Sequence, residues 1–155
     1  ERGRATLGVV HYPVFGITLG VAPGVGAYER LGKRQTPLPR AHPQRALRDA
    51  VIFHGGLRWW TQPRWIRGFQ RILQASYLER AYGDCYGYLW VLRGHVDAMI
   101  DYGVKPWDLV PFAALAQATG RALVDFSGRP SFSGPDTIMA HPTLARLIAR
   151  TLHAS

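Results

Sequence analysis

The feature that most constrains this chain is the order of its apolar segments downstream of residue 83. Segments with apolar residues at helical spacing alternate there with short apolar runs typical of strands. The expected order is helix, strand, helix, strand, strand, helix, over residues 83–94, 96–101, 106–120, 121–126, 137–141 and 142–152. Because such a chain buries its strands beneath the intervening helices, we predict an α/β fold with a mixed sheet flanked by helices.

The first third of the chain has the pattern of β structure. Apolar runs over residues 7–12 and 17–22 flank a Pro/Gly turn, which predicts a β-hairpin, and residues 24–28 add a tight reversal. Residues 33–43 hold three prolines and several basic side chains, a composition typical of a surface connection. We therefore expect a unit of strands over residues 1–43 and an α/β unit over residues 44–155.

Two further elements are expected between these regions. Residues 50–54 form an apolar run that predicts a short buried strand. Thr61 and Pro63 are typical of a helix start, with a capping hydroxyl and an early proline, and Trp65, Phe69 and Ile72 follow at helical spacing.

Charge and composition narrow the classes of function. The chain has 19 Lys and Arg residues against 10 acidic ones, a net charge of +9, but the arginines are scattered and no recognised nucleic-acid motif is present. No apolar run approaches the roughly 20 residues needed to span a bilayer. We expect neither a nucleic-acid nor a membrane partner. The single cysteine, Cys85, cannot form an internal disulfide, which favours a cytoplasmic location.

Three short segments carry chemistry: GDCYGY at residues 83–88, GHVDAMID at 94–101 and KPWDL at 105–109. Together with the strands of residues 7–28, they resemble the inositol monophosphatase family, and most of all its histidinol-phosphatase-like branch. The Trp-Asp pair in its Pro-Trp-Asp-Leu context, seven residues after an acidic strand end, is the most specific element.

The resemblance implies the C-terminal part of a layered αβαβα sandwich, in which the hairpin belongs to an N-terminal sheet. It also implies hydrolysis of a phosphate monoester by a metal-activated water. Asp108 matches the aspartate that binds Mg²⁺ and is our candidate catalytic residue, since Mg²⁺ prefers carboxylate and phosphate oxygens. Asp101 matches an acidic residue that contacts the organic part of the substrate. Gly83 and Asp84 match a helix N-terminus near the substrate.

Each of these residues also has a purely structural interpretation. Asp108 could be a first-turn aspartate favoured by the helix dipole, Asp101 a plain strand-end carboxylate and Asp84 a helix cap. We interpret Cys85 as a small core residue, and Trp59 and Trp60 as packing or contact residues.

The family's main metal motif, Asp-Pro-x-Asp-Gly-Thr, does not occur, and no acidic residue lies between Glu1 and Glu29. One carboxylate is a poor Mg²⁺ site, so we expect these 155 residues to be inactive alone. Activity would require a further N-terminal part that carries the missing metal ligands. Association of two copies of the chain as a homodimer is also possible. The chain also has Thr119-Gly120-Arg121 where relatives usually carry a Gly-Gly pair, and Arg121 is expected to crowd the helix exit.

Three hypotheses follow. The first is an Mg²⁺-dependent phosphatase of a small phosphorylated substrate, histidinol phosphate or inositol phosphate. The second is a non-catalytic remnant that binds a partner. The third, a basic nucleic-acid-binding module, predicts steeply salt-dependent binding and is disfavoured by the scattered arginines.

Overall fold

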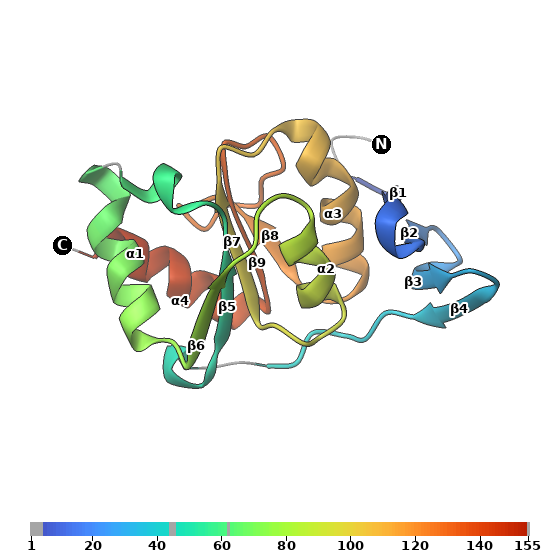
Figure 1. The fold of residues 1–155 in the computed structure, drawn as a ribbon, viewed down its shortest axis with the longest axis horizontal. Helices are drawn as coiled ribbons and strands as arrows, with labels where there is room; N and C mark the ends of the chain where they lie inside the picture. The colour runs from blue at the N-terminus through green and yellow to red at the C-terminus, as the bar shows by residue number, and fades with distance from the viewer. Residues whose placement is uncertain (1–4, 44–45, 62, 155) are drawn as a thin grey trace.

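The computed structural model describes residues 5–43, 46–61 and 63–154. Two β-sheets and four α-helices are stacked in layers (Figure 1). A four-stranded sheet is followed by a pair of helices, then by a five-stranded sheet, and then by a second pair of helices. The α/β class predicted from the alternating pattern is confirmed.

The four-stranded sheet is an antiparallel meander of β1 (Gly8–Tyr12), β2 (Ile17–Ala22), β3 (Gly26–Leu31) and β4 (Arg34–Pro37). The predicted hairpin is confirmed, with Tyr12 paired to Ile17 across a short 3₁₀ turn. The interpretation of residues 33–43 as a plain connection is wrong, because residues 34–37 pair with β3. The missed signal is Gly32, which opens the two-residue turn between β3 and β4 with a positive φ.

The five-stranded sheet has the order β6-β5-β7-β9-β8. Its strands are β5 (Val51–His54), β6 (Leu78–Ala81), β7 (Ala98–Tyr102), β8 (Ala122–Val124) and β9 (Asp136–Ala140). Strand β5 runs parallel to β6 and β7, whereas β9 is antiparallel to β7 and β8, so the sheet is mixed as predicted. Strand β6 was not predicted, because this edge strand keeps most of its side chains exposed and has no apolar run.

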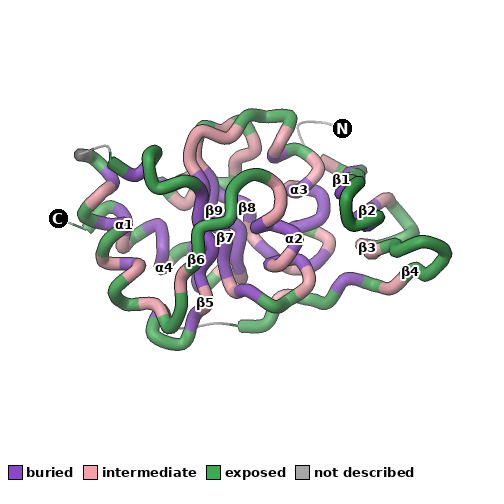
Figure 2. The backbone as a smooth tube through the Cα atoms, in the orientation of Figure 1, coloured by how far each residue is buried: buried purple, intermediate pink, exposed green. Residues whose placement is uncertain are grey.

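Helices cover both faces of this sheet. Helices α1 (Pro63–Ala75) and α4 (Pro142–His153) lie on one face, and α2 (Tyr86–Leu92) and α3 (Pro106–Ala118) on the other (Figure 1). Two apolar cores result, one on each side of the sheet, and buried residues concentrate along its strands (Figure 2). The core under α2 and α3 also includes residues of β1 and β2, so α3 packs between the two sheets.

Helix α1 begins at Pro63, as predicted, but the predicted capping by Thr61 is wrong. The Thr61 hydroxyl donates a hydrogen bond to the carbonyl of Arg58 at 2.9 Å, and Thr61 ends a 3₁₀ turn, Leu57–Thr61. Gln62 lies outside the described residues. Among the residues that the structure describes, none of the helices combines the length and apolar character needed to cross a membrane.

Arg121 does not crowd the end of α3. Thr119 closes the helix with its hydroxyl bonded to the carbonyl of Leu115 at 2.8 Å. The buried Arg121 instead donates to the carbonyl of Pro39 at 2.9 Å, and burial lowers its pKa to about 10. The segment after β4 is thereby held against the α/β unit, while the division at residue 43 remains a hypothesis.

Candidate functional site

The candidate site lies where the three parallel strands end. Strands β5, β6 and β7 point the same way, so the segments that follow them meet at one edge of the sheet. In open α/β sheets, this carboxyl edge is the usual place for a ligand. A cavity of about 320 Å³ opens there, and it is lined by Gly56, Trp59, Gly83, Asp84, Cys85, Tyr88, Asp101, Tyr102, Gly103, Val104 and Asp108.

All four residues singled out in the sequence line this one cavity, although they come from three separate segments. Larger hollows exist beside α3, of about 560 and 720 Å³, but neither has an acidic, histidine or cysteine side chain in its lining. Chemistry, not size, therefore identifies the candidate site.

Asp101 is the most buried of the three carboxylates. It lies in β7 with 5% of its surface exposed, and its Oδ1 accepts a hydrogen bond from the backbone N–H of Tyr102 at 2.8 Å. A Cβ atom on Gly55 would overlap Oδ1, so glycine at that position makes room for the carboxylate. Burial, with a smaller contribution from the nearby Asp84 and Asp108, raises the pKa of Asp101 to about 7. Asp101 can therefore either donate or accept a hydrogen bond near neutral pH.

Asp108 lies in the first turn of α3, as predicted. Its Oδ2 accepts a hydrogen bond from the backbone N–H of Lys105 at 3.0 Å, which is the contact expected of a helix-capping carboxylate. The interpretation of Asp108 as a helix-capping residue is therefore correct for its Oδ2 atom. The described residues offer no hydrogen bond to Oδ1, so capping leaves this oxygen available to a ligand in the cavity.

Asp84 and Gly83 form the link between β6 and α2. Asp84 has a φ of 55°, a left-handed conformation that aspartate tolerates better than most residues. The helix starts only at Tyr86 and its cap position is Cys85, whose side chain makes no capping bond. The helix therefore starts two residues after the Gly83–Asp84 pair near which it was predicted, and the capping interpretation of Asp84 is wrong. The positive φ turns the chain before the helix begins.

The donor set supports Mg²⁺ binding only in part. In the described ranges, no group of three or more His, Cys, Asp or Glu side chains is arranged to hold a metal ion. Asp108 is suited to supply one oxygen ligand, but Mg²⁺ needs further carboxylate, phosphate or water oxygens. Within this part of the chain, Asp108 would be one ligand of an ion completed by other groups.

Cys85, Trp59 and Tyr88 complete the wall of the cavity. Burial, together with the nearby carboxylates, raises the pKa of the Cys85 thiol to about 11, which keeps it protonated and agrees with its interpretation as a packing residue. Trp60 is buried and stacks on Phe69 at 3.9 Å, but Trp59 lines the cavity and is half exposed. The interpretation of both tryptophans as packing or contact residues did not predict that Trp59 lines the cavity. Tyr88 is the last residue of the GDCYGY segment, and its place in the cavity was not predicted.

The loop between β8 and β9 braces the segment that joins Asp101 to Asp108. The backbone N–H groups of Gly103 and Val104 both donate to the carbonyl of Pro135, at 2.6 and 3.2 Å. A Cβ atom on Gly134 would overlap the carbonyl of Val104, so the two segments are in close contact.

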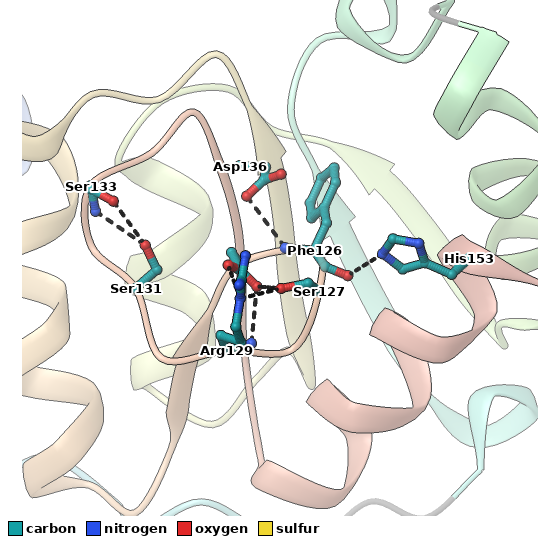
Figure 3. Close-up of polar contacts among 8 residues, drawn as sticks. Phe126, Ser127, Arg129, Ser131, Ser133, Asp136 and His153 are labelled. Carbon is teal, nitrogen blue, oxygen red and sulfur yellow. Dashed lines mark hydrogen bonds and ion pairs between the residues drawn. The ribbon is translucent and has the colours of Figure 1, made fainter.

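Polar contacts hold this loop (Figure 3). Asp136 accepts from the backbone N–H of Phe126 at 3.3 Å, and the ring of His153 in α4 contacts the carbonyl of Phe126 at 3.0 Å. Arg129 donates to the hydroxyl of Ser127 at 2.9 Å. The loop therefore connects α4 to the cavity wall.

Comparison with known proteins agrees with this geometry. The family model described as the inositol monophosphatase family matches residues 1–155. A histidinol-phosphatase of Streptomyces coelicolor is 27% identical over 146 residues, which cover 93% of this chain and 53% of that protein. The chain thus spans about half the length of this curated relative.

Solved structures share the fold. SaIMPase-II with inositol monophosphate bound, an enzyme of Staphylococcus aureus, matches with a TM-score of 0.82 at 21% identity, covering 96% of this chain and 56% of that one. An IMPase/NADP phosphatase complexed with NADP and Ca²⁺ matches with a TM-score of 0.82 at 19% identity, covering 97% and 56%. The predicted sandwich-phosphatase fold is confirmed, and the chain belongs to the inositol monophosphatase family.

Proposed function

We propose that this chain forms the C-terminal part of a metal-dependent phosphatase that hydrolyses a small phosphate monoester. The observation that carries the proposal is the convergence of Asp84, Asp101 and Asp108 on one cavity at the carboxyl edge of the sheet. In this cavity, carboxylates from separate segments can contact both a cation and the organic part of a substrate. Membership of a phosphatase family supports the same conclusion.

Asp108 is the proposed ligand of Mg²⁺, through the oxygen that does not cap α3. When bound, Mg²⁺ would neutralise charge on the phosphoryl group and lower the pKa of a water molecule. Asp101 lies deeper in the cavity and is proposed to bind a hydroxyl or N–H group of the alcohol that is released. Gly83 and Asp84 border the cavity and are proposed to contact the substrate.

Among phosphate esters we propose histidinol phosphate over inositol phosphate. The cavity combines carboxylates with the half-exposed ring of Trp59, which lies over Gly103 and 6.5 Å from the ring of Tyr102. Carboxylates and an aromatic face attract a cationic amine or imidazole more than an uncharged polyol. The histidinol-phosphatase relative supports this choice. We also propose a cytoplasmic location, because the single cysteine of the chain cannot form an internal disulfide.

The rest of the metal site is proposed to come from outside these residues. Asp108 by itself leaves most of the hydration shell of Mg²⁺ in place, so the 155 residues alone should not turn over substrate. The alternative is a non-catalytic protein that keeps the fold and binds a partner, which the absence of the Asp-Pro-x-Asp motif from this sequence favours.

The test measures phosphate release from histidinol phosphate and inositol phosphate, with and without Mg²⁺. It compares this chain with a form extended upstream to include the missing carboxylates. We expect Mg²⁺-dependent release only in the extended form, reduced at least a hundredfold by Asp108→Asn, since one electrostatic contact to the transition state is worth about 10²–10³ in rate.

Asparagine keeps an oxygen that can accept from Lys105, so the cap of α3 survives. Glu79→Gln on β6 is the matched control, because it removes a carboxylate outside the cavity. Release by the 155-residue chain itself would refute the incomplete metal site. No release by either form would favour the non-catalytic alternative.

A further inference from the structure

Two buried hydroxyl groups lie behind the carboxylates of the cavity. The side chain of Tyr88 is 1% exposed and that of Thr137 is fully buried. Neither hydroxyl forms a hydrogen bond with any residue that the structure describes. Buried polar groups without partners are uncommon, since each loses its hydrogen bonds to water on folding.

Both hydroxyls belong to the same side of the five-stranded sheet as Asp101. Side chains alternate along a strand, so Asp101 and Met99 of β7 share the face covered by α2 and α3. Thr137 and Met139 of β9 share that face too, and Thr137 pairs directly with Asp101.

Tyr88 reaches the same place from α2. Its ring is stacked on Phe112 of α3 with the ring centres 4.6 Å apart, so the position of its hydroxyl is fixed by packing. Tyr88 also lines the cavity, and the carboxylate of Asp101 lies near enough to add to the burial that raises the pKa of this tyrosine.

The hydrogen-bonding capacity of this group exceeds what the protein uses. Thr137 lies near enough to Tyr88 to lower its pKa slightly, but the two hydroxyls do not meet the geometry of a hydrogen bond. Even a bond between them would use only one of their two O–H donors. Among the described residues, Asp101 accepts a hydrogen bond only at Oδ1, from the backbone N–H of Tyr102. Donors and acceptors therefore remain free in a group that borders the cavity through Tyr88 and Asp101.

We propose that Tyr88 and Thr137, together with Asp101, form a recognition subsite for an N–H or O–H group on the organic part of the substrate. Tyr88 and Thr137 are specificity-determining residues in this account and take no part in the hydrolysis itself. The inference rests on the proposed function and adds to it the chemical group that this subsite selects, which is a hydrogen-bond donor and acceptor such as an imidazole, amine or hydroxyl.

The test introduces Tyr88→Phe and Thr137→Val into the form of the protein that is extended upstream to include the missing carboxylates. Affinity is measured by calorimetry for histidinol phosphate, for histidinol and for inorganic phosphate, and the melting temperature is measured without ligand. Tyr28→Phe is the matched control, because it makes the same chemical change in the four-stranded sheet, outside the cavity.

We expect Tyr88→Phe and Thr137→Val each to bind histidinol phosphate and histidinol roughly two- to tenfold more weakly, as for the loss of one hydrogen bond, while affinity for inorganic phosphate is unchanged. The melting temperature of Tyr88→Phe should not fall, because the hydroxyl that is removed has no partner in the free protein.

A lower melting temperature for Tyr88→Phe, or unchanged affinity for both organic ligands, would overturn the inference. Equal weakening for inorganic phosphate would also overturn it, since a change in the whole site is then responsible. If the unmodified protein binds no phosphate ester, the proposed function fails together with this inference. If the unmodified protein and Tyr88→Phe both bind and do so equally well, only this inference fails.

Discussion

The two faces of the five-stranded sheet differ in what they bury. Under α1 and α4, aromatic rings pack on one another, as where Trp60 stacks on Phe69 at 3.9 Å and Trp65 meets Phe126 edge-on at 5.2 Å. Under α2 and α3, the rim of the sheet buries Asp101 and two hydroxyls that have no partner among the described residues, whereas the α1/α4 core has one such group, the indole N–H of Trp60. Asp84, at the mouth of the same cavity, has a left-handed backbone conformation.

This difference indicates that the two faces contribute unequally to stability. Close packing of large apolar side chains stabilises the fold, whereas a buried carboxylate, an unpaired hydroxyl and an unfavourable φ all reduce the free energy of unfolding. Groups that lower stability and gather at one cavity are expected where a site binds a ligand. Removing a ring from the α1/α4 core and removing a polar group from the cavity should therefore have opposite effects on stability.

The largest effect is expected on the α1/α4 face. Phe69→Ala removes a side chain that is 2% exposed, and we expect a loss of about 3–5 kcal/mol in the free energy of unfolding, because the neighbouring rings cannot close the space that it leaves. Denaturant unfolding measures this loss. Val14→Ala, at a side chain 90% exposed, is the control and should change stability by less than about 0.5 kcal/mol. A loss below about 1 kcal/mol for Phe69→Ala would contradict this view of that face.

A smaller effect of opposite sign is expected for Asp101. Because the pKa of Asp101 is about 7 in the folded protein and 3.8 for an aspartate in water, the folded state binds more protons between these values. Stability due to this group is therefore full below pH 4 and decreases as the pH rises through 7, by at most about 1.4 kcal/mol per pH unit. Asp101→Asn removes this dependence.

We expect Asp101→Asn to become more stable than the unmodified protein as the pH rises, by up to roughly 4 kcal/mol above pH 7, while it binds histidinol phosphate more weakly. Thermal and denaturant unfolding between pH 4 and 8 measure the difference. Asp97→Asn is unsuited as a control, because Asp97 accepts a hydrogen bond from the backbone of Val51 at 2.8 Å. Glu79→Gln on β6, which removes a carboxylate outside the cavity, is preferable. A stability difference that does not vary with pH would contradict the assignment.

The smallest effect is expected for Asp84. Asp84→Gly relieves the left-handed backbone, which should add up to about 1 kcal/mol of stability, although the greater freedom of glycine in the unfolded chain offsets part of the gain. The same change removes a carboxylate from the cavity and should weaken ligand binding. Asp84→Ala is the informative companion, since it removes the carboxylate and keeps the strain. If alanine were as stable as glycine at this position, the backbone would not be strained.

Local chemistry made much of the fold predictable. Pro106 and Gly120 bracket α3, and the apolar run ending at His54 marks β5, because proline, glycine and apolar periodicity act through nearby backbone alone. Strand β6 was missed because its sequence, Leu-Glu-Arg-Ala, shows no pattern apart from the pairing that β5 provides.

The candidate site was predictable to a different degree. Asp84, Asp101 and Asp108 were identified by resemblance and by their places near element ends, and the structure brings them to one cavity. The place of Tyr88 could not be predicted, because it depends on its stacking against Phe112 and on the pairing of Thr137 with Asp101. Contacts of this kind join residues far apart in the sequence.

The most direct test of the central claim is to locate ligand binding in the ¹⁵N-labelled protein by nuclear magnetic resonance, with histidinol phosphate and Mg²⁺ added stepwise. The account predicts that the amide signals of Gly56, Asp84, Gly103 and Asp108 shift together and that Asp108→Asn abolishes the Mg²⁺-dependent part. A basic hollow of about 350 Å³ formed by Arg146, Arg150 and His153 lies elsewhere on the molecule. Shifts confined to that hollow would contradict the account.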